Sequence, residues 1–375
     1  MRVVVTGQVG LDKAEFLAQT AAAAERMGRQ VAVYNVGEMM YAEAPDVPQG
    51  RILNLPLSRL TALRRSVFKD VLAQAARQAN VIVNTHATFR WRHGLFYGFD
   101  HDIMKELDAD LYVVLVDNID RVHARLRRDG HTDHNLKDLM VWREEETLAT
   151  ELLAEIVRGH GRFYILARGI HGPNPTELAK LIFAPQFRKA YLSFPMSNVV
   201  GDAAVAAEIH RLRTAMRKYF TCFDPGDLEE KPLAVEALAA AKAGRRLVTL
   251  RVDGREVEFE TAELVGIIPD IDGQIYARDF KLIDQSDMII SLIPGLPGRA
   301  GGGPARAAIS SGVERELQHA HEAGKDVFVI WPSAAPQSPF VTETATAVFE
   351  SIEEAIRYFA ENGYIPEPSP GGLFA

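Results

Sequence analysis

Short apolar runs alternate along the first half of the chain with longer stretches in which apolar residues recur every three or four positions. The runs predict β-strands, and the longer stretches predict amphipathic α-helices. The predicted strands are residues 2–6, 30–35, 81–84, 111–116 and 162–166. The predicted helices are residues 12–27, 60–78, 102–107, a segment beginning near residue 120, and 176–183. Because short strands separated by helices form βαβ units, this half predicts an α/β domain with a doubly wound parallel sheet.

The second half repeats the alternation with one interruption. Its predicted strands are residues 190–194, 288–293 and 327–331, and its predicted helices are 203–220, 275–285, 313–323 and 351–359. Two alternating runs between them flank Asp253-Gly254, and an Asp-Gly pair in this position is a strong signal for a β-hairpin. We therefore expect two doubly wound domains, residues 1–184 and 185–365. The second domain would carry a hairpin insertion near 228–265 and a mobile loop at 295–306, and residues 366–375 would form a flexible tail.

The composition fits two globular domains and excludes several other classes of protein. Of 375 residues, 47% are hydrophobic and 25% are charged, which is typical of chains that bury sizeable cores and not of disordered, collagen-like or coiled-coil chains. The longest apolar runs fall short of the roughly 20 residues that span a bilayer, and no secretory signal is visible. Cys222 is the single cysteine, so no disulfide within the chain is expected. These features predict a cytoplasmic protein with no membrane partner.

The net charge of −8 is unevenly distributed. Residues 1–184 carry 23 basic and 23 acidic side chains, whereas residues 185–375 carry 19 and 27. Proteins that bind duplex nucleic acid gain most of their affinity by neutralising phosphates with basic side chains. We therefore do not expect a duplex partner, whereas a small phosphorylated ligand remains possible.

A loop at the end of the first predicted strand contains Gly7, Gly10 and Lys13. In a phosphate-binding loop, backbone N–H groups cradle the phosphate, a lysine reaches it, and a following Ser or Thr hydroxyl binds Mg²⁺. Here Asp12 stands immediately before the lysine and Ala14 immediately after it. A phosphate would meet a negative charge and a metal would find no hydroxyl, which argues against the use of ATP and Mg²⁺.

Together with residues 84–90, 126–129 and 143–146, this loop resembles the adenylate kinase group of nucleoside monophosphate kinases over about residues 1–180. The resemblance implies a P-loop NTPase-like fold with arginines that clamp nucleotide phosphates. These would be Arg90, Arg92, Arg125 and Arg128. Asn84, where the family has an acidic residue that organises the metal, is a third departure. A nucleotide-binding or purely structural pseudokinase and an active kinase are the alternatives. The spacing of the histidines matches no metal motif, so no metal site is expected.

The second half contains three further motifs, residues 275–279, 283–287 and 310–317. Ser310, Ser311 and Gly312 open a predicted helix, and backbone N–H groups at the start of a helix favour an anion. Glu316 lies about one turn further along, so it can face the same cleft. Ligands of open parallel sheets bind beyond the carboxyl ends of the strands, where these segments should meet.

In combination these motifs resemble the nucleoside 2-deoxyribosyltransferase superfamily, including its nucleoside monophosphate N-glycosidase branch, over roughly residues 188–333. The resemblance implies that Glu316 is a nucleophile and that Asp279 orients the sugar or helps to protonate the leaving base. It also implies that Ser310, with the N–H groups of residues 311 and 312, holds a 5′-phosphate. Other residues expected at the substrate are Ser193 and Phe194, at the end of the first strand, and Asp287, for which a structural role as a cap is the alternative. The superfamily completes its sites across subunits, which implies a homo-oligomer.

We therefore expect cleavage of the N-glycosidic bond of a nucleoside monophosphate or nucleoside by Glu316, by hydrolysis or by transfer to a second base. No cofactor is needed for this reaction, and the first domain would bind a nucleotide. One alternative is a non-catalytic nucleotide sensor that signals to a partner. Another is a bifunctional enzyme that retains nucleotide kinase activity.

Overall fold

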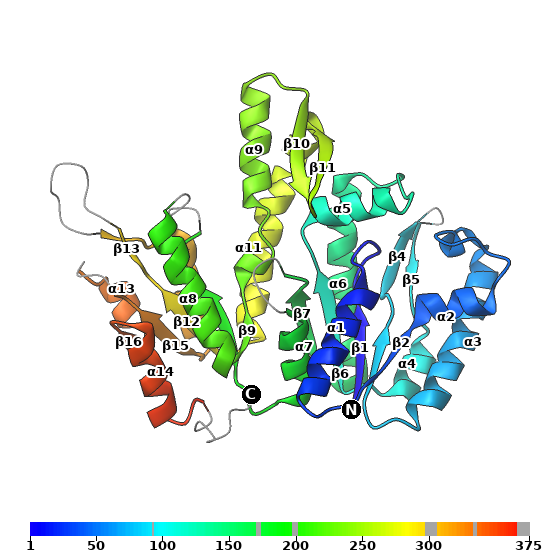
Figure 1. The fold of residues 1–375 in the computed structure, drawn as a ribbon, viewed down its shortest axis with the longest axis horizontal. Helices are drawn as coiled ribbons and strands as arrows, with labels where there is room; N and C mark the ends of the chain where they lie inside the picture. Colours follow the sequence, from blue (N-terminus) through cyan, green and yellow to red (C-terminus); the bar gives the residue numbers. More distant parts are fainter. Residues whose placement is uncertain (92–93, 170–173, 197–201, 297–305, 333–335, 366–375) are drawn as a thin grey trace. The chain divides into compact units, whose positions relative to one another are not determined.

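A computed structural model of the chain describes residues 1–91, 94–169, 174–196, 202–296, 306–332 and 336–365 (Figure 1). Arg92, most of the predicted loop 295–306 and the predicted tail 366–375 therefore lie outside the described residues. The chain divides into two compact units. Unit 1 consists of Met1–Phe183 and Asp227–Ile275, and unit 2 consists of Ala184–Gly226 and Tyr276–Ala375. Within the described residues, no helix combines the length and the apolar character needed to cross a membrane.

Unit 1 contains a five-stranded parallel sheet with the strand order β2-β3-β1-β6-β7. The strands are β1 (Arg2–Thr6), β2 (Ala32–Asn35), β3 (Val81–Asn84), β6 (Leu111–Val116) and β7 (Phe163–Ala167). In the centre of the sheet, Val4 lies opposite Val83 on one side and Tyr112 on the other. All six residues of β6 are buried, as expected for a parallel strand that is covered on both faces. The predicted strands of the first half are thus confirmed, with ends shifted by at most two residues.

The helices of unit 1 connect these strands. They are α1 (Lys13–Arg26), α2 (Val36–Glu43), α3 (Leu57–Ala75), α4 (His101–Leu107), α5 (Ile119–Arg128), α6 (Leu136–Arg158) and α7 (Asn174–Phe183). A capping box begins α6: the Asn135 side chain accepts from the Asp138 N–H at 2.8 Å, and the Asp138 carboxylate accepts from the Asn135 N–H at 3.4 Å. Sequence analysis missed α2, the short 3₁₀ helix Ile52–Asn54 and the antiparallel hairpin of β4 (Thr88–Trp91) and β5 (Gly94–Tyr97). The hairpin is only partly buried, so its apolar alternation is weak.

The segment between residues 227 and 275 forms α9 (Lys231–Lys242), β10 (Leu247–Val252), β11 (Arg255–Glu260), α10 (Thr261–Gly266) and the beginning of α11 (Ile268–Asp284). Strands β10 and β11 pair antiparallel with Val252 opposite Arg255. The two residues between them, Asp253 and Gly254, have φ of 47° and 79°, the left-handed values that a type I′ turn requires. The predicted hairpin is confirmed. It groups with unit 1, however, and not with the second half of the chain as expected.

A buried ion pair explains why this segment packs on unit 1. The Arg143 guanidinium on α6 donates to both carboxylate oxygens of Glu230, at 2.8 and 2.9 Å. Glu230 also accepts from the Ile119 N–H at 2.8 Å, and its side chain is fully buried. Contacts of this kind join residues that are far apart in the sequence, and no local pattern reveals them.

Breaking the buried pair should destabilise the protein strongly. We expect Glu230→Gln to lower the free energy of unfolding by about 3 kcal/mol or more, because the Arg143 charge is then buried without a counter-charge. The matched control is Glu236→Gln, which removes a carboxylate paired with Arg245 at the surface of the same segment. Its effect should stay within about 1 kcal/mol. Urea unfolding of the three proteins measures both values, and equal losses would contradict the structural role of the buried pair.

Unit 2 contains a second five-stranded parallel sheet, with the order β16-β15-β12-β8-β9. Its strands are β8 (Lys189–Ser193), β9 (Thr221–Phe223), β12 (Met288–Leu292), β15 (Asp326–Ile330) and β16 (Ala347–Phe349). The other elements are α8 (Ala203–Tyr219), the end of α11, the two-residue strands β13 (Gly295–Leu296) and β14 (Arg306–Ala307), α12 (Ser311–Glu322), α13 (Pro339–Thr342) and α14 (Ile352–Glu361). The predicted α/β class with two parallel sheets is therefore confirmed. The strands β9 and β16 were missed because three residues are too few to show a period.

Candidate functional site

A carboxylate lies at the carboxyl end of β8 in unit 2. Tyr191 and Ser193 are two residues apart on this strand, so their side chains project from the same face of the sheet, and both residues are fully buried. The Tyr191 hydroxyl donates to Glu316 Oε1 at 3.0 Å, and the Ser193 hydroxyl donates to Glu316 Oε2 at 2.6 Å. Glu316 itself projects from α12. The structure thus brings together Ser193 and Glu316, two of the residues that sequence analysis singled out, and adds Tyr191.

A second carboxylate influences the first. Burial and then the negative charge of Asp279 raise the pKa of Glu316 to about 8, against the hydrogen bonds of Ser193 and Tyr191. Burial also raises the pKa of Asp279, but Arg278 opposes this shift with a contact of 3.2 Å. At neutral pH, Glu316 therefore mostly keeps its proton. A buried carboxyl group with a raised pKa beside a second carboxyl group is suited to acid–base and nucleophilic chemistry.

The start of α12 is ordered by its own cap. Ser310 Oγ accepts from the Val313 N–H at 3.3 Å, so this hydroxyl satisfies a backbone donor of the first turn. Ser311 and Gly312 are exposed at the same end of the helix. The helix that was expected to present N–H groups to an anion therefore does begin at Ser311. The Ser310 hydroxyl caps this helix through its bond to the Val313 N–H.

Two other predicted substrate residues lie elsewhere. Phe194 belongs to the core of unit 2, and the Arg213 guanidinium carbon lies 4.6 Å from the centre of its ring. Asp287 precedes β12 and accepts from the backbone N–H of Lys189, the first residue of β8, at 2.8 Å. Asp287 is therefore at the amino edge of the sheet, whereas Ser193 is at the carboxyl edge. These contacts fit the alternative for Asp287, a structural role as a cap.

In unit 1, the loop between β1 and α1 is tightly built. Gly7 has a φ of 136°, and an added Cβ would lie 2.7 Å from the Leu115 carbonyl oxygen, so this position requires glycine. The buried Glu146 carboxylate on α6 accepts from the N–H groups of Gly7, Ala87 and Thr88 at 2.7 to 2.9 Å. Gly10 also has a positive φ, of 90°. The loop therefore has positive φ at both glycines, and the N–H group of Gly7 is already bound to the chain's own carboxylate.

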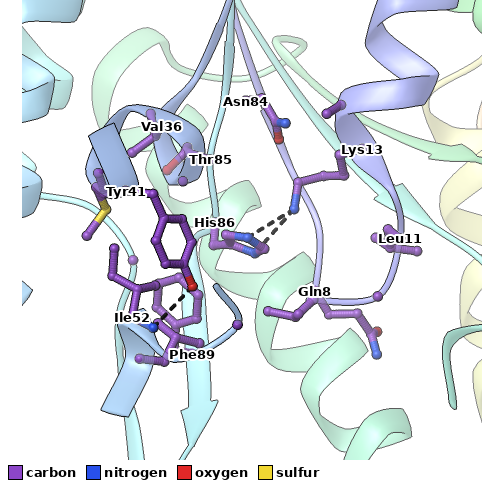
Figure 2. A pocket seen from close by; sticks show the side chains of 18 of the residues that line it. Gln8, Leu11, Lys13, Val36, Tyr41, Ile52, Asn84, Thr85, His86 and Phe89 are labelled. Atoms are coloured by element: carbon purple, nitrogen blue, oxygen red, sulfur yellow. Dashed lines mark hydrogen bonds between the residues drawn. The ribbon is translucent and has the colours of Figure 1, made fainter. Parts of the chain in front are cut away.

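Lys13 does not extend toward an open phosphate position. Its Nζ donates to the Gly7 carbonyl oxygen at 2.7 Å and lies 3.2 and 3.3 Å from the two ring nitrogens of His86 (Figure 2). Burial lowers the pKa of Lys13 to about 7, against the charge of Glu146. Burial and the charge of Lys13 lower the pKa of His86 well below its usual range, so the ring is neutral. The amine is therefore only partly charged at pH 7 and is held by the chain itself.

A cavity of about 580 Å³ opens beside this loop (Figure 2). Its walls include Lys13, His86 and Asn84 together with apolar and aromatic side chains from α2, from Ile52 and from β4, such as Tyr41 and Phe89. Large, mostly apolar pockets with a few polar groups are typical of small-molecule sites. The volume and the aromatic side chains suit a flat heterocycle such as a nucleobase.

Arg64 also lines this cavity and was missed by sequence analysis. Its guanidinium donates to the Tyr97 carbonyl oxygen at 2.8 Å, but its Nε has no hydrogen-bond partner among the described residues. Only 7% of the residue is exposed. The sequence did contain a signal for this buried arginine, because Arg64 occupies a position in the buried stripe of α3 where apolar residues are otherwise found. The wall of the cavity therefore includes a buried guanidinium, whose positive charge favours an anionic ligand nearby.

The predicted phosphate-clamping arginines are all paired within the chain where the structure describes them. Arg90 binds the Glu145 carboxylate at 2.6 and 3.1 Å. Arg125 contacts Asp117 at 2.7 Å and Asp253 at 3.0 Å, and Arg128 binds both carboxylate oxygens of Asp12, at 2.9 and 3.1 Å. Arg125 and Arg128 are close to the loop, through contacts with Gly10 and Asp12, but the side-chain partners of all three arginines are carboxylates.

The residues beside Lys13 do not fit a magnesium–triphosphate site. Ala14 offers no hydroxyl, and the Asn84 amide donates to Asn35 Oδ1 at 2.8 Å. In the described part of the chain, no three His, Cys, Asp or Glu side chains are grouped so that they could hold a metal. A P-loop that binds ATP with Mg²⁺ needs both groups that are replaced here.

Residues 6–142 match the protein family described as AAA domain. The adenylate kinase of Pyrococcus abyssi is 26% identical over 139 residues, which are 36% of this chain and 69% of that protein. The adenylate kinases of Pyrococcus furiosus and Pyrococcus horikoshii are each 24% identical over the same lengths.

Three solved structures also align with the chain. The 2-deoxyribosyltransferase of Bacillus psychrosaccharolyticus has a TM-score of 0.29 and 17% identity, covering 47% of this chain and 96% of its own. Shikimate kinase of Bacteroides thetaiotaomicron has a TM-score of 0.33 and 15% identity, covering 48% and 98%. The tunicamycin resistance protein of Deinococcus radiodurans has a TM-score of 0.26 and 16% identity, covering 42% and 95%. From the sequence matches, the N-terminal part of the chain is similar to the AAA-domain family and to adenylate kinases.

Proposed function

We propose that the chain cleaves the N-glycosidic bond of a nucleoside or nucleoside monophosphate with Glu316 as the nucleophile, and that unit 1 binds a nucleotide. One observation carries the proposal. Both carboxylate oxygens of Glu316 are held by the buried hydroxyls of Tyr191 and Ser193, and burial together with the charge of Asp279 raises its pKa. A glutamate on a merely solvated face of a helix would have neither the hydrogen bonds nor the shift.

The reaction divides into two displacements. In the first, Glu316 loses its proton to solvent and an oxygen of its carboxylate bonds to the anomeric carbon while the bond to the base breaks; the base leaves with the bonding electron pair and takes up a proton from Asp279 in its protonated form or from water. In the second, water or another base attacks the same carbon and releases Glu316. The transition states resemble an oxocarbenium ion, whose positive charge a nearby carboxylate stabilises. Water as the acceptor gives hydrolysis, and a second base gives transfer.

The surrounding residues have separate tasks. Tyr191 and Ser193 fix the direction of the Glu316 carboxylate, because each donates to a different oxygen. Burial and, next to it, the negative charge of Asp279 disfavour ionisation of Glu316. We assign to Asp279 a hydrogen bond from the sugar or, in its protonated form, donation of a proton to the departing base. All four residues belong to unit 2, so the chemistry can be assigned without unit 1.

Unit 1 supports the nucleotide-binding part of the proposal through its cavity. The cavity has aromatic walls for a base, and Arg64 places a positive charge in its wall for an anionic group. Lys13, Ala14 and Asn84 are not arranged for a magnesium triphosphate, so we propose binding without phosphoryl transfer. The similarity to adenylate kinases favours a nucleotide over other flat ligands.

Arg64→Gln tests the role of this cavity. We expect the variant to bind nucleoside monophosphates about tenfold more weakly than the wild type, because it loses a charge-assisted hydrogen bond. The matched control is Arg65→Gln, which alters the neighbouring arginine, half exposed and paired with Asp100. Calorimetric titration of the three proteins measures the affinities. Equal weakening by both substitutions would contradict a specific contact at Arg64.

Chromatography of free bases tests the function. The full chain is incubated with ribonucleosides, deoxyribonucleosides and their monophosphates, with and without a second base. We expect base release or exchange from at least one member of the panel, which also identifies the substrate. Light scattering of the same preparation tests the proposed homo-oligomer.

The second candidate is a non-catalytic nucleotide sensor. The specific observation in its favour is that the Lys13 amine and the clamping arginines are satisfied within the chain, which leaves unit 1 able to bind and unable to transfer phosphate. Nucleotide binding without release of any base would favour this candidate. Phosphate transfer from ATP that is lost in Lys13→Met would favour a kinase instead.

A further inference from the structure

A second cavity of unit 1, of about 440 Å³, is lined by four arginines and as many acidic side chains. The arginines are Arg121, Arg125 and Arg128 from α5 and Arg168, which follows β7. The acidic residues are Asp12, Glu15, Asp117 and Asp253. Arginines gathered around a cavity are typical of sites for planar or tetrahedral anions, because each guanidinium presents several donors in a fixed geometry. Here the anions beside the arginines are carboxylates of the chain itself.

Asp253 is the acidic residue that comes from outside the P-loop-like part of unit 1. Its carboxylate lies 3.0 Å from Arg125 Nη2 and accepts from Arg125 Nε at 3.1 Å, while Arg121 Nη1 is 3.6 Å away. Asp117 Oδ2 lies 2.7 Å from Nη1 of the same guanidinium. Arg125 is only 5% exposed, whereas the Asp253 side chain is 40% exposed. The arginine is therefore built into the fold, and the carboxylate approaches it from the solvent side.

The backbone of the hairpin turn positions this carboxylate. Asp253 stands at the tip of the β10–β11 hairpin in the left-handed region, which asparagine and aspartate tolerate better than other residues with a Cβ. The base of the hairpin is anchored, because the buried Phe259 ring lies 5.3 Å from the His123 ring on α5. The anchored base and the half-exposed tip allow the tip to change its contacts while the hairpin stays attached.

We propose that Asp253 is a built-in occupant of an anion site: its carboxylate takes the place on Arg121 and Arg125 that a phosphoryl group of a ligand would take. A phosphate-bearing ligand then binds in this cavity only by displacing the tip of the hairpin. The inference rests on unit 1 binding a phosphate-bearing ligand, and it is independent of the reaction at Glu316. The insertion thereby controls access to the arginines.

The test uses inorganic pyrophosphate, so it depends on neither a nucleobase nor the glycosidic reaction. Isothermal titration compares the full-length wild type, Asp253→Asn and Glu258→Gln. Asparagine tolerates the left-handed backbone, so the turn is retained, and the substitution removes only the competing charge. Glu258→Gln removes one exposed negative charge from the same hairpin and controls for the general change in net charge. We expect pyrophosphate to bind Asp253→Asn about tenfold or more tighter than it binds the other two proteins.

A second substitution tests whether the gain in pyrophosphate affinity depends on Arg121. Adding Arg121→Gln to Asp253→Asn should return the affinity to that of the wild type, since a donor of the site is lost. Equal affinities of wild type and Asp253→Asn would overturn the proposal, as would an equal gain in Glu258→Gln. Thermal unfolding of each variant shows whether the fold is intact, and Asp253→Gly, which also accepts a positive φ, replaces the asparagine variant if that one is unfolded. A loss of thermal stability without any gain in affinity would show that Asp253 only anchors the hairpin.

Discussion

Replacing Glu316 with glutamine should lower kcat for base release about 10³-fold or more, which corresponds to about 4 kcal/mol in the barrier. Glutamine has nearly the same shape and can still bind Tyr191 and Ser193, so the site should keep its form. It lacks the carboxylate that bonds to the anomeric carbon. Chromatography of the released base under single-turnover and steady-state conditions measures the loss.

The matched control lies on the same helix. Glu314 is exposed on α12 two residues before Glu316, and Glu314→Gln should retain the activity of the wild type. Substrate binding to Glu316→Gln, measured by titration, should remain, because the proposed role of Glu316 is in the chemical step. Full activity in Glu316→Gln would remove the nucleophile from the mechanism, whatever the substrate.

The second large effect is the dependence of kcat/KM on pH. Burial and the charge of Asp279 raise the pKa of Glu316 to about 8, and only the ionised carboxylate can attack. We expect kcat/KM of the wild type to rise about tenfold per pH unit below about pH 8 and to level off above it, since this parameter reports the free enzyme. Rates measured between pH 5.5 and 9.5 at saturating and limiting substrate give the profile.

Asp279→Asn should move this profile in a defined direction. The variant removes the negative charge that disfavours ionisation of Glu316, so the midpoint should shift to lower pH, toward the ordinary range of a glutamate. The plateau above pH 8 should also fall if Asp279 acts on the sugar or the base. A midpoint that stays near 8 in the variant, or a wild-type profile that falls as pH rises from 5.5 to 8, would contradict the coupling of the two carboxyl groups.

Local patterns in the sequence predicted much of the fold. The strands of the first parallel sheet, and β8, β12 and β15 of the second, could be predicted because buried parallel strands are continuous apolar runs, as in β6. The hairpin could be predicted because Asp253 and Gly254 are the residues that accept the backbone of its turn. The glycines of the first loop could likewise be assigned, since Gly7 approaches a backbone carbonyl so closely that no other residue fits.

The contacts between distant segments could not be predicted in this way. Lys13 is bound by His86, which is 73 positions away, and Arg125 by Asp253, which is 128 positions away. Nothing in the local sequence around these residues indicates their partners, because the packing of the folded unit determines them. The grouping of the hairpin with unit 1 depends in the same way on the buried pair of Arg143 and Glu230.

The candidate site of unit 2 could be predicted from the sequence only in part. Ser193 and Glu316 could be placed at one edge because Ser193 ends a strand and Glu316 follows a helix start, and parallel sheets gather such segments. The position of Asp287 favours its structural alternative: it precedes β12, and residues before a parallel strand lie at the opposite edge of the sheet from Ser193, which ends β8.

The most direct test of the central claim is mass spectrometry of the covalent intermediate. The full chain is mixed with a 2-fluoro-2-deoxy analogue of the nucleoside or nucleotide found in the chromatographic panel, because the fluorine slows breakdown of the glycosyl ester. We predict that the protein gains the mass of one glycosyl group and that the peptide containing Glu316 carries it. Release of base with no adduct at Glu316, or with the adduct on another residue, would contradict the assignment of Glu316 as the nucleophile.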